Sequence, residues 1–112
     1  MKYLIVVFNL MILAAGGLAV AAPAEDTIVE LRFENRRWMP QTITVPANRQ
    51  FRIKIVNASK EAVEFESFKL NREKVIGPGE TATINMPALK PGSYDFYDDF
   101  HADVPEGKIV AK

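Results

Sequence analysis

Two short runs of acidic residues carry the side chains of this sequence that are best suited to bind a metal. The first is Glu64-Phe65-Glu66, and the second runs from Asp98 to Asp103 and includes His101, the only histidine of the chain. Both occur at predicted strand ends, and so small a domain can rarely bury a carboxylate without a partner. Carboxylates and imidazoles are donors for Cu(II), iron, manganese and zinc. The two runs are therefore candidate sources of metal ligands.

The composition argues against several other kinds of chemistry. The chain has no Cys, which excludes disulfides and the thiolate bond of a blue-copper site. No Ser or Cys nucleophile has a second His to orient it, which argues against a hydrolase. Acidic and basic residues balance at 14 each, so no net field attracts nucleic acid or an anionic membrane. The pair Arg36-Arg37 is interpreted as part of a solvated loop.

The hydrophobic pattern predicts strands along the rest of the chain. Apolar and polar residues alternate with period two in residues 27–33 and 51–55, which is typical of strands with one buried face. Further strands are predicted at residues 42–45, 63–68, 81–86, 93–98 and 108–111, and a loop at 35–40. Short strands separated by Pro, Gly and Asn predict an all-β Greek-key sandwich of about seven to eight strands. The run from Leu89 to Tyr94 predicts a tyrosine corner.

The N-terminal segment has the layout of a helical secretory signal. Lys2 is followed by an apolar run and then by small residues, and two A-x-A sites end at Ala21 and Ala24. We expect a signal peptide at residues 1–24, cleaved before residue 22 or 25, one domain at 25–112, and export to the periplasm. An uncleaved membrane anchor is the alternative, because the apolar run reaches the roughly 20 residues that cross a bilayer.

The order of these motifs resembles the cupredoxin-like family over essentially all of residues 27–112. Cupredoxins bind copper with a Cys, two His and often a Met. In the run from Tyr97 to His101, His101 falls on a ligand histidine and Asp98 on the cysteine. Glu64 falls on the other histidine, and the methionine has no match. The chain is most similar to proteins and domains associated with bacterial ferrous-iron uptake permeases, which share its E-F-E segment, Pro-Gly turn, L-x-P-G-x-Y corner and acidic F-H run.

The resemblance implies a metal site made of Glu64, Asp98 and His101 that holds copper and/or iron without blue-copper character. It also implies periplasmic handling of iron for an inner-membrane permease, with at most an assisting role in Fe(II) oxidation. The sequence supports no other enzymatic activity. Second-tier ligands are Glu66, Met39, Asp99 and Asp103.

The alternation of apolar and polar residues does not decide the orientation of every candidate side chain. Asp98 shares its strand parity with Phe96 and is expected to face inward. Val63 and Phe65 resemble a core pair, so Glu64 and Glu66 form an outward patch unless the strand is bulged. Trp38 is expected to be a lid or an exposed contact for a partner. The alternative function is a metal-free interaction module that has lost the copper site.

Overall fold

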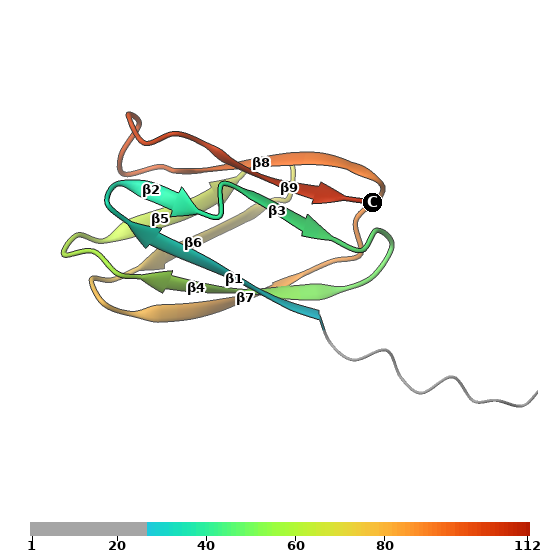
Figure 1. The fold of residues 1–112 in the computed structure, drawn as a ribbon, viewed down its shortest axis with the longest axis horizontal. Coiled ribbons are helices and arrows are strands. Elements are labelled where there is room, and N and C mark those ends of the chain that lie inside the picture. The colour runs from blue at the N-terminus through green and yellow to red at the C-terminus, as the bar shows by residue number, and fades with distance from the viewer. Residues whose placement is uncertain (1–26) are drawn as a thin grey trace, which may run out of the picture.

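The computed structural model describes residues 27–112, which form nine strands in two facing sheets (Figure 1). The strands are β1 (Thr27–Glu34), β2 (Arg37–Met39), β3 (Thr42–Val45), β4 (Phe51–Asn57), β5 (Val63–Ser67), β6 (Arg72–Ile76), β7 (Thr81–Met86), β8 (Gly92–Asp98) and β9 (Gly107–Ala111). No helix in this part of the chain has the length and apolar character needed to cross a bilayer. The expected signal peptide or anchor at residues 1–24 lies outside the described residues.

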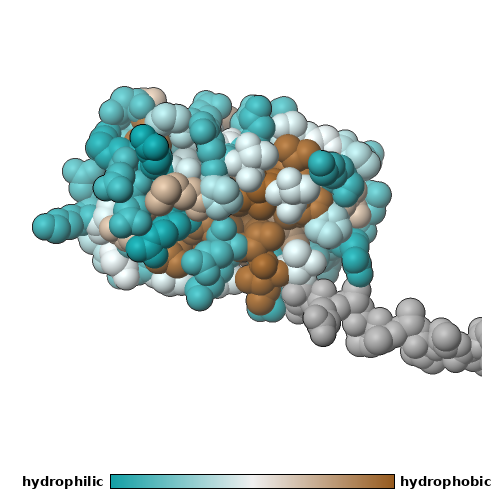
Figure 2. Space-filling view, viewed as in Figure 1, coloured by the Kyte–Doolittle hydropathy of each residue, from teal (hydrophilic) through white to brown (hydrophobic). Residues whose placement is uncertain are grey.

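The two sheets confirm the expected all-β sandwich. One sheet has the strand order β2-β1-β4-β7 and the other the order β3-β9-β8-β5-β6. β1 pairs in parallel with β4, and β3 with β9, whereas the other pairs are antiparallel. One end of the sandwich, here called the polar end, carries the β1–β2, β4–β5, β6–β7 and β8–β9 turns (Figure 1). Hydrophilic side chains cover most of that end, as Figure 2 shows.

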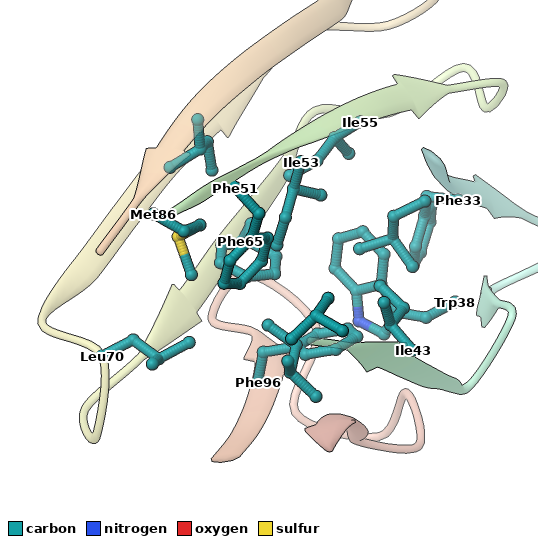
Figure 3. Packing of buried hydrophobic residues seen from close by; sticks show 14 of the residues in the cluster. Phe33, Trp38, Ile43, Phe51, Ile53, Ile55, Phe65, Leu70, Met86 and Phe96 are labelled. Atoms are coloured by element: carbon teal, nitrogen blue, oxygen red, sulfur yellow. The ribbon is translucent and has the colours of Figure 1, made fainter. Parts of the chain in front are cut away.

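The core lies between the sheets and is filled by the inward-facing residue of each alternating pair (Figure 3). Ile53 and Ile55 of β4 are fully buried, as are Phe65 of β5 and Phe96 of β8. Phe96 lies directly over its cross-strand partner Gly107, where an added Cβ would fall 2.3 Å from the ring. Glycine at position 107 is therefore required by the close approach of this ring.

The segment 35–40, which was predicted to be a loop, contains the short strand β2. Glu34 pairs with Arg37, so Asn35 and Arg36 form a two-residue hairpin turn. Both turn residues have positive φ, 53° and 57°, as the turns favoured in such hairpins require. The turn was missed because its second residue is Arg, whereas Gly is the usual signal at that position.

β6 was also missed, because it lacks a two-residue hydrophobic alternation. It lies at the edge of the five-stranded sheet, and Glu73, Lys74 and Val75 are exposed one after another. An edge strand packs few of its side chains against the core, so its sequence does not need to alternate.

The predicted tyrosine corner is confirmed. The Tyr94 hydroxyl donates a hydrogen bond of 2.7 Å to the Lys90 carbonyl oxygen, across the turn that precedes β8. This bond fixes the connection between β7 and β8 at the end of the sandwich opposite the polar end.

Trp38 lies in the centre of the core, so the expectation that it is an exposed lid or partner contact is wrong. It pairs across the hairpin with Phe33, and both side chains point inward. Its ring centroid lies 4.9 Å from that of Phe33, 6.0 Å from Phe65 and 5.6 Å from Phe96, all in edge-on arrangements. The hairpin geometry of β2, which the sequence did not reveal, turns this side chain inward.

Replacing Trp38 by Ala should lower the free energy of unfolding by about 3–5 kcal/mol, because it opens a cavity among three aromatic rings. Phe68→Ala is the matched control, because Phe68 is 80% exposed. The control should change stability by no more than about 0.5 kcal/mol. Urea unfolding followed by circular dichroism measures both values. Equal effects of the two substitutions would contradict the central packing role of Trp38.

Candidate metal centre

Asp98 is a buried carboxylate at the end of β8 and faces inward, as its parity with Phe96 predicted. It is 1% exposed. Its Oδ1 accepts hydrogen bonds of 3.0 Å from the backbone N–H groups of Glu64 and Phe100. Its Oδ2 lies 2.6 Å from His101 Nδ1. One side chain thus joins the start of β5 to the β8–β9 loop.

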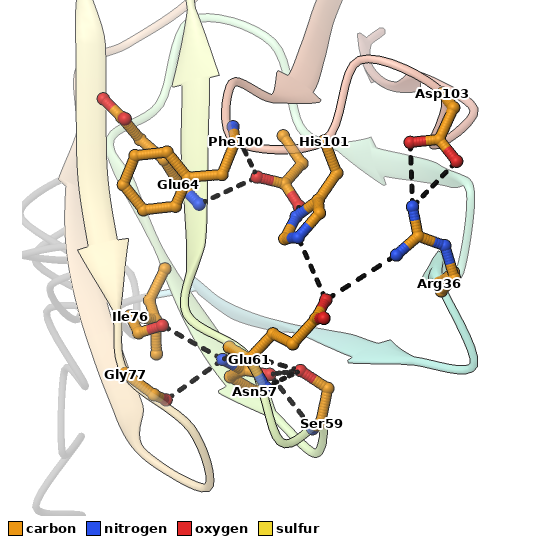
Figure 4. A network of polar contacts seen from close by, with 11 residues as sticks. Arg36, Asn57, Ser59, Glu61, Glu64, Ile76, Gly77, Phe100, His101 and Asp103 are labelled. Atoms are coloured by element: carbon orange, nitrogen blue, oxygen red, sulfur yellow. Dashed lines mark hydrogen bonds and ion pairs between the residues drawn. The ribbon is translucent and has the colours of Figure 1, made fainter.

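His101 is held between two carboxylates at the polar end (Figure 4). Its Nδ1 faces Asp98, and its Nε2 lies 3.0 Å from Oε2 of Glu61 in the β4–β5 loop. Each ring nitrogen is thus within hydrogen-bond distance of a carboxylate oxygen. Neither ring nitrogen is left pointing to an open position.

Arg36, in the β1–β2 turn, forms further ion pairs next to His101 and Glu61. Its guanidinium lies 3.6 Å from Glu61 and 2.7 Å from the Asp103 carboxylate. Hydrogen bonding to Asp103 raises the pKa of Arg36, and the same bond lowers the pKa of Asp103. Asp103, expected as a second-tier ligand, is therefore half of an exposed ion pair.

Asn57 fixes the loop that carries Glu61. It is fully buried, and its amide nitrogen lies within 3.0 Å of the carbonyl oxygens of Glu61, Ile76 and Gly77. Its Oδ1 accepts hydrogen bonds from the backbone N–H and the hydroxyl of Ser59. The sequence analysis did not single out Asn57 or Glu61. The Asn-x-Ser spacing at the end of a strand was the available signal, because Asn side chains commonly bond to the backbone two residues on.

Glu64 sends its carboxylate to the opposite face of the sheet from Asp98. β5 pairs with β6 in continuous register, without a bulge, and Val63 and Phe65 are fully buried. Glu64 and Glu66 therefore point outward, which is one of the two orientations left open by the sequence. The inward-facing residue at this end of β5 is Val63.

On the outer face, Glu64 and Glu66 meet Asp99. One carboxylate oxygen from each residue lies within 4.8 Å of the other two, and no other such group of three is present in residues 27–112. We call these three residues the acidic cluster. Asp99 reaches it because it follows Asp98 by one residue and so points to the other side of the sheet.

The environment of the acidic cluster opposes negative charge. Partial burial raises the pKa of Glu64 and of Glu66, and the charge of nearby Asp99 raises both pKa values further. Glu73 on the neighbouring strand acts in the same direction. Tyr97 forms a side-chain hydrogen bond with Glu66, and burial together with these carboxylates raises the pKa of Tyr97.

The structure thus separates the three predicted ligands, Glu64, Asp98 and His101, into two groups. Asp98 and His101 are in contact, but Glu64 reaches Asp98 only through its backbone N–H. The Glu64 carboxylate instead joins Glu66 and Asp99, two of the second-tier residues. Met39, the remaining second-tier residue, is half-buried at the end of β2.

The residues that face inward at the polar end, Asp98, His101 and Val63, do not fit the copper site of a cupredoxin. Both oxygens of Asp98 and both ring nitrogens of His101 are engaged with other protein groups, and Val63 offers no donor atom. The three oxygen donors of the acidic cluster suit hard or borderline cations, Cu(II) included, rather than Cu(I).

Removing the Asp98 side chain should destabilise the protein strongly. Asp98→Ala leaves two partly buried backbone N–H groups and the His101 ring without their acceptor at a position that is itself buried, for a loss of about 3–5 kcal/mol. Asp103→Ala, in the same loop, removes only an exposed ion pair and should leave the free energy of unfolding close to the wild-type value. Urea denaturation of the two variants measures the difference. Similar losses in both would show that Asp98 does not hold the loop.

Comparisons with known proteins agree with the fold. Residues 3–111 match the family described as the cupredoxin-like domain. The chain is 37% identical over 87 residues to the uncharacterized protein RP394 of Rickettsia prowazekii, a match that covers 76% of this chain and 70% of that protein.

Solved structures extend the likeness to copper proteins. The metal-binding domain of a Cu(I)-exporting P-type ATPase from Streptococcus pneumoniae, solved with Cu(I), superposes with a TM-score of 0.68 at 15% identity, covering 76% of this chain and 84% of that domain. Dithionite-reduced auracyanin from Roseiflexus castenholzii gives a TM-score of 0.64 at 16% identity, covering 78% and 98%. A sandwich of this topology and the family match over nearly the whole sequence lead to one conclusion: the chain belongs to the cupredoxin-like domain family.

Proposed function

We propose that this protein is an exported metal-binding protein that holds a copper or iron ion at Glu64, Glu66 and Asp99 and serves as an accessory to a membrane iron-transport system. The observation that carries the proposal is the meeting of three carboxylates within 4.8 Å on one face of a cupredoxin-like sandwich. Carboxylates that raise one another's pKa gain most from a bound cation, because the cation relieves their repulsion.

The donor chemistry narrows the range of ions. Three carboxylate oxygens favour Cu(II), iron, manganese or zinc over Cu(I), which prefers sulfur. Copper is named in a structural relative, the ATPase domain, as Cu(I). This supports copper as one cargo, which the three oxygen donors of this protein would hold as Cu(II). The resemblance to proteins associated with ferrous-iron permeases supports iron as the other.

The proposals of export and of a membrane transporter as partner rest on the sequence. The charged, apolar and small-residue order of residues 1–24 supports secretion to the periplasm. An ion held at the protein surface can be passed to or taken from a membrane transporter. One mononuclear site does not store the electrons of a multi-electron oxidase, so the protein would bind and deliver the ion, with at most an assisting role in Fe(II) oxidation.

A metal-free interaction module is the second candidate. It is favoured by the inward-facing pair Asp98 and His101, in which both carboxylate oxygens and both ring nitrogens are already engaged with other groups of the protein. In this view, hydrogen bonds have taken over the structural role of the ion, and the acidic cluster is only a charged surface.

Calorimetric titration with Cu(II), and with Fe(II) under nitrogen, tests the metal site. Wild-type protein should bind one ion, and Glu66→Gln should weaken binding by about tenfold or more, because a charged donor is lost. Glu30→Gln on the exposed face of β1 is the matched control and should bind as wild type does.

Two outcomes would contradict this assignment. Loss of binding in His101→Ala, but not in Glu66→Gln, would return the site to Glu64, Asp98 and His101. Equal and weak binding by all the variants would leave the metal-free module.

Without metal, the acidic cluster should make stability fall as pH rises. A carboxyl whose pKa is raised in the folded state binds more protons folded than unfolded, so stability is lost from about its ordinary value of 4.5 upward. The double variant Glu64→Gln/Glu66→Gln should show a flatter profile in urea unfolding with EDTA present. Saturating metal should flatten the wild-type profile as well, whereas parallel profiles of wild type and variant would refute the coupling.

A further inference from the structure

A shallow hollow lies beside the acidic cluster on the outer face of the five-stranded sheet. Its volume is about 560 Å³, and it is formed by the β5–β6 turn, β8 and the β8–β9 loop. Its lining residues are Phe68, Lys69, Asp95, Tyr97, Asp99 and Glu106. Only Asp99 is shared with the acidic cluster.

One wall of the hollow is an exposed aromatic side chain. Phe68 is 80% exposed, more than any other large hydrophobic residue in the described part of the chain. Its ring lies 5.7 Å from that of Tyr97 at an angle of 46°. The turn beneath it is anchored, because the Ser67 hydroxyl donates a 2.7 Å hydrogen bond to the Asp95 carbonyl and Leu70 is buried. Phe68 is therefore presented to solvent on an anchored turn.

The rim of the hollow is negatively charged. Asp95, Asp99 and Glu106 line the hollow together with one cationic residue, Lys69, whose ammonium lies 3.3 Å from the Ser93 carbonyl oxygen. Lys108 lies opposite Asp95 in the β8–β9 register, so three acidic residues meet two basic ones at the rim. Glu64 and Glu66 extend the negative charge along β5. The whole chain has zero net charge, so this concentration of acids is a local property of one face.

We propose that the hollow docks a segment of a partner protein in which a Lys or Arg adjoins an apolar side chain. The apolar side chain would cover Phe68 and Tyr97, and the cation would lie against Asp95 and Glu106, where it could also contact the aromatic rings. A small ligand is a poorer match, because ligand pockets bury most of their ligand and this hollow is bounded by a projecting, exposed ring. The docking proposal requires no metal and goes beyond the proposed metal site.

The test is a titration of the isotope-labelled protein in EDTA, followed by amide chemical shifts in NMR. The probe is a blocked pentapeptide, Gly-Lys-Phe-Arg-Gly, and its acidic analogue is Gly-Glu-Phe-Asp-Gly. Shifts should be confined to the β5–β6 turn, β8 and the β8–β9 loop, with a dissociation constant of about 1 mM, a value reasonable for so small a contact. The acidic analogue should not bind.

Two variants localise the contact. Phe68→Ser should weaken binding by about fivefold or more, as expected for loss of an aromatic anchor. Ile28→Ser is the matched control on β1, since Ile28 is 53% exposed, and it should bind as wild type does. Asp95→Asn/Glu106→Gln should weaken binding, and added salt should do the same in wild type.

Several results would overturn the proposal. They are the absence of shifts up to about 10 mM peptide, shifts spread over both sheets, or equal binding of the acidic analogue. Shifts in the hollow that depend on protein concentration without peptide would make the occupant a second copy of this chain. If the peptide does not bind but the metal does, the acidic cluster remains the functional site and the docking proposal is wrong. If the peptide binds but no metal does, the interaction module is supported.

Discussion

The polar end of this sandwich depends on one buried carboxylate. Asp98 accepts backbone hydrogen bonds from Glu64 and Phe100 and contacts His101, so it ties β5, β8 and the following loop together. His101 then reaches Glu61, and Arg36 links that residue to Asp103. A buried charge of this kind is tolerated only when its partners are complete, because an unpaired carboxylate in the core is strongly unfavourable. The polar end is thus cross-linked by hydrogen bonds and ion pairs between groups of the protein itself.

This arrangement has a consequence for the chemistry of the fold. Asp98 stands where the family resemblance places a copper-binding cysteine, but its oxygens are used by the protein, as are the nitrogens of His101. A second group of carboxylates lies on the other face of the same sheet, where Glu64, Glu66 and Asp99 converge. The alternation of β5 and β8 separates the two groups: residues that hold the fold face inward, and residues that could hold an ion face outward. The aromatic hollow adjoins the outer group through Asp99.

Much of the fold could be predicted because the residues of a half-buried strand alternate between apolar and polar with period two, which shows which side chains face the core. That pattern gave the strands β1 and β4 and the inward direction of Asp98. The pattern did not reveal β2 and β6, because each of these strands has few inward-facing residues. Missing β2 also led to the wrong prediction for Trp38, whose burial depends on the two-residue turn at Asn35 and Arg36. One partner of His101, Glu61, was equally hidden, since it comes from the β4–β5 loop, far along the chain from the second acidic run.

By itself, the sequence determined the all-β class, the strand alternation, the tyrosine corner at Tyr94, the absence of a thiolate and the presence of two acidic runs. Tertiary structure decided which carboxylates meet. The reason is that β5 and β8 are adjacent in one sheet but are separated along the chain by β6 of that sheet and β7 of the other. Their register places Glu66 opposite Tyr97 and Phe65 opposite Asp98. A shift of one residue in that register would exchange the inner and outer groups, so the burial of one face fixes the register. Local sequence patterns do not specify that β5 lies next to β8, which is a property of the strand order.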